Sequence, residues 1–186
     1  MQKCALYFGS FNPLHYGHLA IAEYVMRHCD IDRFVMVLSP HNPFKKVEDL
    51  EEPGKRYESL QREIAKFNER FATGHVGAGK CNKLEISDIE FHLSEPLYTI
   101  NTLHELQKQE PDTEFLLVVG SDSFNSLPRW HRGEEILKEF RVIVYPRKGS
   151  DVRAMAEKYN AIYLENAPLN NISSTEIRNG HADNGL

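Results

Sequence analysis

The fold is decided by the stretch Gly9-Ser10-Phe11-Asn12-Pro13-Leu14-His15-Tyr16-Gly17-His18, which follows an apolar run at residues 4–8. After this stretch, residues 18–28 repeat apolar side chains close to a helical period. A short buried strand, a glycine-bounded loop and a helix in direct succession are typical of the first unit of an α/β fold. The stretch therefore predicts that the chain opens with a strand, a ligand-binding turn and a helix.

Further apolar segments repeat this alternation along the chain. Helical spacing recurs at residues 56–70 and 99–109, where apolar residues stand three or four apart. Unbroken apolar runs are typical of parallel strands buried on both faces. The sequence thus predicts an α/β protein with a doubly wound parallel sheet. Its further strands are expected at residues 34–38, 115–119, 140–145 and 162–164. Residues 84–91 alternate only locally between apolar and polar side chains, so the sequence leaves open whether they form an exposed or edge strand.

Composition favours an ordinary globular chain. The 186 residues carry a formal charge of −5, with 41% hydrophobic and 26% charged residues. At roughly 150 residues per domain, one domain over residues 1–186 is expected. The longest apolar runs have five residues, whereas a membrane span needs about 18, and no secretory signal is visible. Three widely spaced cysteines suggest no disulfide framework, which favours a cytoplasmic protein. The mild acidity argues against binding to nucleic acid or a membrane surface.

The loop between the first strand and helix has the features of an anion site. Gly9 and Gly17 let the backbone approach a ligand closely, and a helix N-terminus presents N–H groups and a positive dipole end. His15 and His18 add two imidazole donors. Neither a dinucleotide fingerprint nor a P-loop is present. A capped turn with two surface histidines and a zinc site are the alternatives, although no third zinc ligand has an obvious spacing.

The same stretch resembles the signature of the HxGH nucleotidyltransferases. Three further segments narrow the resemblance to the nicotinate-nucleotide adenylyltransferase family: residues 98–103, Gly120-Ser121-Asp122 with Leu127-Pro128-Arg129-Trp130, and residues 172–178. The resemblance implies a Rossmann-like nucleotidyltransferase fold. It also implies adenylyl transfer from ATP to nicotinate mononucleotide, giving nicotinate adenine dinucleotide and pyrophosphate, a step of NAD biosynthesis.

The resemblance implies that His18 and His15 are catalytic, with His18 donating to the α-phosphate. It places ATP against Gly9, Ser10, Phe11, Gly17, Gly120, Asp122, Ser173, Ser174, Thr175 and Arg178. From the residues alone, Ser173 and Glu176 have the spacing of a helix capping box. Asp122 is equally suited to cap a helix. Those structural interpretations stay open beside the ligand-binding ones.

For the mononucleotide, the resemblance implies contacts from Asn12, Lys46, Thr99, Trp130 and Arg147. The family's tryptophan stacks on the pyridine ring, although a lone Trp is more often a packing residue. Lys45 stands beside Lys46, so either lysine is a candidate for phosphate contact. The sequence offers no carboxylate cluster for a protein-held metal, so Mg²⁺ is expected mainly on the substrate phosphates and water.

Rival functions remain at this stage. Pantetheine-phosphate adenylyltransferases share the motif but typically carry Thr where this chain has His15. A catalytically silent nucleotide-binding module and a zinc-binding protein are the rivals from other classes. The expected partners are ATP and nicotinate mononucleotide. The sequence carries no signal of oligomeric state, so a homo-oligomer stays open. The choice between nicotinate and nicotinamide mononucleotide cannot be read from the residues.

Overall fold

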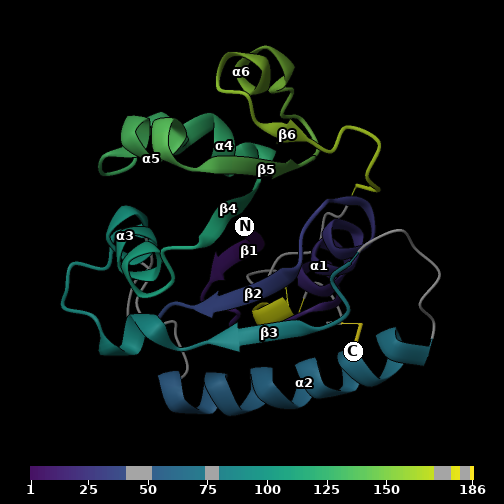
Figure 1. Ribbon diagram of the computed structural model, residues 1–186. Helices are drawn as coiled ribbons and strands as arrows, with labels where there is room; N and C mark the ends of the chain where they lie inside the picture. The colour runs from purple at the N-terminus through teal and green to yellow at the C-terminus, as the bar shows by residue number, and fades with distance from the viewer. Residues whose placement is uncertain (41–51, 74–79, 170–176, 181–184) are drawn as a thin grey trace.

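The computed structural model describes residues 1–40, 52–73, 80–169, 177–180 and 185–186. Within these residues six parallel strands form one sheet in the order β3-β2-β1-β4-β5-β6 (Figure 1). The chain moves outward from β1 to β3 and then returns to the other side of β1 with β4. The strands are β1 (Gln2–Gly9), β2 (Arg33–Leu38), β3 (Leu84–Ser87), β4 (Thr113–Gly120), β5 (Arg141–Tyr145) and β6 (Ile162–Tyr163).

The order of strands reverses between β1 and β4, and this is where an open α/β sheet binds its ligands. The two strands pair in parallel, with Tyr7 opposite Val118. On the other side of β1, Gly9 pairs with Leu38 at the end of β2. Because all strands run the same way, the residues that follow β1, β2, β4 and β5 emerge at one edge of the sheet.

Helices cover both faces of the sheet, and each face has its own core. On one face, α1 (Tyr16–His28) and α2 (Pro53–Thr73) contribute to a cluster that includes Leu60 and Phe67. The second cluster includes Leu103 and Ile136 from helices on the opposite face. Those helices are α3 (Thr99–Gln109), α4 (Ser121–Ser126), α5 (Gly133–Glu139) and α6 (Arg153–Lys158), with the 3₁₀ turns η2 (Ile89–His92) and η3 (Leu127–Arg129). The sheet is thus doubly wound, as predicted.

The predicted strands and long helices are all present, with boundaries shifted by a few residues. The ambiguous segment at residues 84–91 splits into the outermost strand β3 and the turn η2. A turn is also expected from the sequence at residues 149–151, and it is confirmed, since Gly149 has a φ of 79°. A loop is also expected from the glycine-rich sequence at residues 72–82. This segment lies partly outside the described residues, and its first two residues belong to α2. The short helices α4, α5 and α6 have no counterpart among the predicted elements.

All three cysteines are buried without a disulfide. Burial raises the pKa of Cys4 to about 12 and that of Cys29 to about 11, and it also raises the pKa of Cys81. Since only the thiolate reacts readily, we expect the folded chain to resist iodoacetamide at pH 8, whereas the urea-unfolded chain takes up three adducts. Mass spectrometry of the alkylated protein measures this. Rapid labelling of the folded chain would contradict the buried positions.

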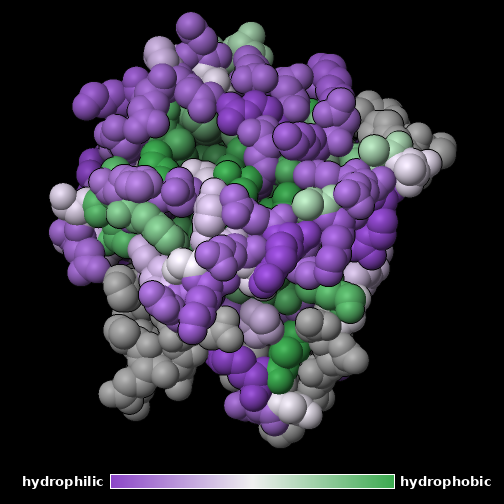
Figure 2. Space-filling view, turned by 90° about the horizontal axis from the view of Figure 1, so that it is seen from below, coloured by the Kyte–Doolittle hydropathy of each residue, from purple (hydrophilic) through white to green (hydrophobic). Residues whose placement is uncertain are grey.

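Figure 2 shows a face dominated by hydrophilic residues, with hydrophobic ones visible in small areas between them. Among the described residues, the large hydrophobic side chains that stand exposed are Met1, Tyr16, Leu169 and Leu186. None of the helices in the described part of the chain has the length and apolar character needed to cross a membrane.

Candidate active site at the carboxyl edge of the sheet

The loop after β1 carries a strained residue beneath the two histidines. Phe11 has a φ of 42°, in the left-handed region that non-glycine residues rarely adopt. Its ring is only 4% exposed and packs edge-on against His18, with centroids 5.0 Å apart. A Cβ on Gly9 would lie 3.0 Å from this ring. Gly9 therefore lets the Phe11 ring fold back under the loop, where it supports His18; any contact of Phe11 with ATP would come from its backbone.

The orientation of His18 is set by the backbone at the start of α1. The backbone N–H of His15 donates to Nδ1 of His18 over 3.2 Å. Because Nδ1 accepts a hydrogen bond, a neutral His18 ring carries its proton on Nε2. The buried His15 ring stacks on the His18 ring, with centroids 3.7 Å apart and planes inclined by 24°. The local structure thus makes Nε2–H of His18 a donor of fixed orientation at a helix N-terminus.

Asp122 and Arg147 meet above the end of β4. A Cβ built on Gly120 would lie 2.5 Å from Oδ1 of Asp122 and 3.1 Å from Nε of Arg147. The backbone N–H of Arg147 donates to Oγ of Ser121 over 2.8 Å, which ties the segment after β5 to the start of α4. Burial raises the pKa of Tyr7 on β1 to about 12, while Arg147 lowers it and Asp122 raises it. Three predicted residues, Gly120, Asp122 and Arg147, are therefore brought together beside β1.

A cavity of about 520 Å³ opens at the same edge, on the side of the sheet covered by α3 and α4. Its size is in the usual range for a small-molecule site. It contains four of the predicted site residues: Gly9, Ser10, Thr99 and Trp130. The described residues that line it are Phe8, Gly9, Ser10, Ser39, Glu90, Leu97, Tyr98, Thr99, Ser123, Ser126, Arg129, Trp130 and His131.

Aromatic rings shape one wall of this cavity. The indole N–H of Trp130 donates to Oγ of Ser126 over 3.3 Å, which fixes the plane of the half-buried ring. Next to it, His131 stacks on Tyr98 with centroids 4.0 Å apart. The sequence predicts for His131 only a surface or core position; the residue is exposed, and it also lines the cavity. Its place directly after the lone tryptophan was the available signal.

The C-terminal segment reaches the loop after β1. The Arg178 guanidinium donates to the backbone carbonyl of Asn12, and a Cβ on Gly185 would lie 3.0 Å from Cβ of Tyr16. Arg178 and Asn12, both predicted site residues, are thus brought together from opposite ends of the chain. The predicted ATP contacts Ser173, Ser174 and Thr175 lie outside the described residues, as do Lys45 and Lys46.

Glu90 and Arg56 are buried charged residues that the sequence did not single out. Glu90 lines the cavity and is 3% exposed, and burial raises the pKa of its carboxyl group. Arg56 is 2% exposed and donates to the carbonyl of the cavity-lining residue Ser10 over 2.8 Å. A charged residue between Ile89 and Phe91 was the available signal for Glu90. Arg56 stands in an amphipathic helix among other charged residues, and nothing in the sequence sets it apart.

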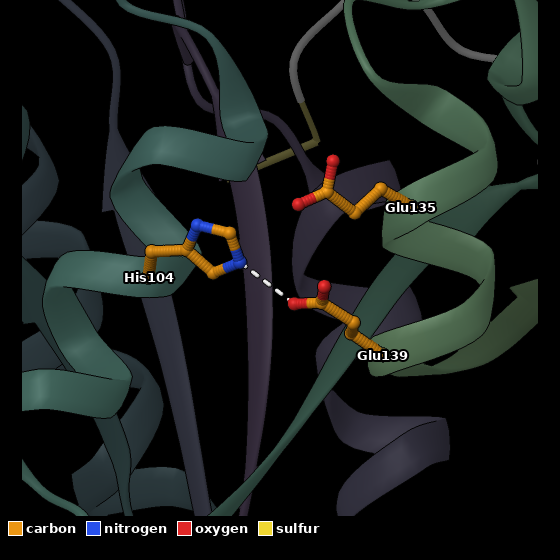
Figure 3. Close-up of side chains that lie close together, drawn as sticks. All are labelled: His104, Glu135 and Glu139. Carbon is orange, nitrogen blue, oxygen red and sulfur yellow. Dashed lines mark hydrogen bonds and ion pairs between the residues drawn. The ribbon is translucent and has the colours of Figure 1, made fainter.

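Among the described residues, one group of three side chains has the composition of a metal site: His104, Glu135 and Glu139 (Figure 3). Nε2 of His104 lies 2.7 Å from Oε2 of Glu139. Both carboxylate oxygens of Glu135 accept hydrogen bonds from Arg132. The group lies on the helices α3 and α5 and contains neither His15 nor His18. These side chains form ion pairs at the surface. They do not support a zinc site in the loop of His15 and His18.

Comparison with known proteins adds independent findings. The Cytidylyltransferase-like family model matches residues 6–180. A probable nicotinate-nucleotide adenylyltransferase of Flavobacterium psychrophilum is 39% identical over 178 residues, covering 95% of this chain and 85% of the relative. A protein of the same name from Bacteroides fragilis is 36% identical over 176 residues, covering 95% and 80%.

The fold also matches solved structures. Plasmodium falciparum nicotinic acid mononucleotide adenylyltransferase complexed with NaAD aligns with a TM-score of 0.73 at 23% identity, covering 96% of this chain and 83% of that protein. At this identity the match supports the fold alone, and it agrees with the doubly wound sheet described above.

Proposed function

This chain belongs to the cytidylyltransferase-like family and, within it, to the nicotinate-nucleotide adenylyltransferases, and from that premise we propose how its residues act in adenylyl transfer. The chain transfers the adenylyl group of ATP to nicotinate mononucleotide, giving nicotinate adenine dinucleotide and pyrophosphate, a step of NAD biosynthesis. It is therefore a nucleotidyltransferase.

The assignment of roles depends on one observation: the cavity and the histidine loop lie next to each other at the end of β1. The cavity walled by Thr99 and Trp130 reaches Gly9 and Ser10, and the same loop continues to the stacked histidines. We assign the cavity to the mononucleotide, with the pyridine ring on Trp130. We assign the helix N-terminus, His15, His18 and Arg178 to the phosphates of ATP. The two substrates then meet over Gly9.

In this arrangement a phosphate oxygen of the mononucleotide attacks the α-phosphorus of ATP in line. A new oxygen–phosphorus bond forms, the bond from the α-phosphorus to the bridging oxygen breaks, and pyrophosphate leaves with that electron pair. Such a transfer depends mainly on positioning and on charge stabilisation. Nε2–H of His18 donates to an α-phosphate oxygen as negative charge develops, and Arg178 stabilises the pyrophosphate.

Mg²⁺ enters this proposal together with the triphosphate. Asp122 is a carboxylate among the predicted ATP contacts. It lies beside the Arg147 guanidinium, which fits a role in binding nucleotide better than one as a lone metal ligand. A bound magnesium ion would neutralise phosphate charge while keeping most of its ligands as water and phosphate oxygens. The protein's part is then to orient the phosphates through the α1 N-terminus, His15 and Arg178.

Pyrophosphate release tests the function directly. The chain is incubated with ATP, Mg²⁺ and either nicotinate or nicotinamide mononucleotide, and pyrophosphate is measured by a coupled assay. We expect rapid release with nicotinate mononucleotide and a lower kcat/KM with the nicotinamide compound. Phosphopantetheine serves as a third acceptor for the closest rival function. Release with phosphopantetheine alone, or with no acceptor at all, would refute the proposed reaction.

Gly120→Ala tests the assignment of Asp122 and Arg147 to the nucleotides. The added methyl group would displace the Asp122 carboxylate, whose Oδ1 lies 2.5 Å from the Cβ position, and it would crowd Arg147. Loss of one hydrogen bond of about 1 kcal/mol corresponds to roughly a fivefold rise in the KM for ATP. Steady-state kinetics measure it, and circular dichroism checks that the variant is folded. An unchanged KM for both substrates would remove this cluster from the site.

A further inference from the structure

A buried arginine holds together the two loops that follow β1 and β2. The side chain of Arg56 comes from the first turns of α2 and is 2% exposed. One terminal nitrogen, Nη1, donates to the carbonyl of Ser10 over 2.8 Å and to that of Ser39 over 2.9 Å. The other, Nη2, donates to the carbonyl of Pro40 over 2.7 Å. A single guanidinium thus bridges the exits of two neighbouring strands.

The need for an arginine follows from this geometry. A buried cation is costly unless polar groups take the place of its water, and three carbonyl oxygens do so here. The planar guanidinium has five N–H donors in a fixed fork, whereas a lysine ammonium is a compact donor on a flexible stem. Lysine at residue 56 could reach one loop but could not hold both loops at a fixed separation. Because Ser10 and Ser39 line the cavity, that separation determines the shape of its floor.

A buried carboxyl group continues the network to the other wall. Oε1 of Glu90 accepts a hydrogen bond from Oγ1 of Thr102 over 2.8 Å, and the Ser39 side chain also hydrogen-bonds this carboxyl group. Thr102 is fully buried on α3, one turn after Thr99 at the cavity. Ser39 is therefore shared by the two buried charged residues: its carbonyl accepts from Arg56, and its side chain meets Glu90. The network joins α2, both loops, η2 and α3.

We infer that Arg56 and Glu90 are positioning residues for the adenylyl transfer: Arg56 fixes the loop after β1 that leads to His18, and Glu90 fixes the α3 N-terminus that presents Thr99. This inference rests on the proposed function. Neither residue is assigned contact with reacting atoms. Both residues support the cavity assigned to the mononucleotide, but only Arg56 also holds the loop that leads to His18, so a large loss of kcat is expected for Arg56 alone.

The first test uses Arg56→Lys and Arg56→Ala. With the β1 loop released, His18 is misplaced relative to the α-phosphate, and we expect kcat to fall by about tenfold. The KM for nicotinate mononucleotide should rise by a few-fold, because Ser10 and Ser39 line its cavity, while the KM for ATP should change by less than about twofold. Added guanidinium ion at low millimolar concentration should restore part of the kcat of Arg56→Ala, which a general loss of stability would not do. Arg62→Lys, on an exposed position of the same helix, is the matched control and should behave as wild type.

The second test uses Glu90→Gln and Thr102→Val, which keep the size of each side chain. We expect the KM for nicotinate mononucleotide to rise by roughly fivefold in each, with the KM for ATP unchanged. Combining the two substitutions should raise this KM by less than the product of the single effects, because both alter the same Glu90–Thr102 contact. Near-ultraviolet circular dichroism and thermal melting establish that each variant is folded.

The outcomes separate this inference from the function on which it rests. If the wild-type chain releases no pyrophosphate with nicotinate mononucleotide, the proposed function fails first. If wild type is active, folded Arg56→Lys with wild-type kcat overturns the role of Arg56, as does an equal loss of kcat in Arg62→Lys. Should both Arg56 variants fail to fold, the network is judged on Glu90→Gln and Thr102→Val. Unchanged mononucleotide KM in those folded variants overturns it.

Discussion

Replacing His18 with alanine is expected to lower kcat by at least roughly a hundredfold while leaving the fold intact. A hydrogen-bond donor that points at the negative charge developing in the transition state typically contributes about 10²–10³ in rate. The donor is Nε2–H, since Nδ1 accepts the backbone N–H of His15. The side chain is only half-buried, and its ring contacts come from His15, Phe11 and Tyr7. Its removal therefore takes away a charge-stabilising group without emptying the core.

The measurement is steady-state pyrophosphate release at saturating ATP and nicotinate mononucleotide, with thermal melting as the check on folding. His28→Ala is the matched control, because His28 is an exposed histidine at the other end of α1. It should retain wild-type turnover. If His18→Ala keeps near-normal kcat, the ring has no part in stabilising the transition state, and the stacked pair with His15 is only a cap of the helix.

The sheet could be predicted from the sequence because its strands are buried on both faces. Such strands appear as unbroken apolar runs, as at β1, β2 and β4, and they need no partner to be recognised. The short helices α4 and α5 could not be predicted in the same way. Each has only six or seven residues, too few for a helical period to stand out, and their stability comes from packing on the sheet.

The site was predictable where its residues lie close together in the sequence. The residues from Gly9 to His18 predict the end of a strand and the start of a helix. Because the strands are parallel, Gly120 at the end of β4 lies at the same edge of the sheet. Arg56 and Glu90 are different, because their partners are backbone carbonyls and hydroxyls from distant segments. Nothing local marks Arg56, because an arginine in an amphipathic helix normally points to solvent. For Glu90, the local signal is its position between two apolar residues. Only the folded chain shows which charges are buried.

Trp130→Ala is the second large effect we expect. An indole stacked on an aromatic base contributes about 1–3 kcal/mol, so the KM for nicotinate mononucleotide should rise roughly 5- to 160-fold. The KM for ATP should stay close to its wild-type value, because the residues assigned to ATP phosphates lie at the α1 N-terminus, whereas Trp130 packs against the core on the opposite face of the sheet.

Trp130→Phe separates stacking from packing in this prediction. The ring of phenylalanine preserves an aromatic face but loses the indole N–H that donates to Ser126, so we expect it to recover most of the mononucleotide affinity that alanine loses. Both KM values are measured with the other substrate saturating. Equal increases for ATP and the mononucleotide in folded Trp130→Ala would mean that the ring only supports the wall of the cavity. A selective increase, reversed by phenylalanine, requires that an aromatic substrate lies against it.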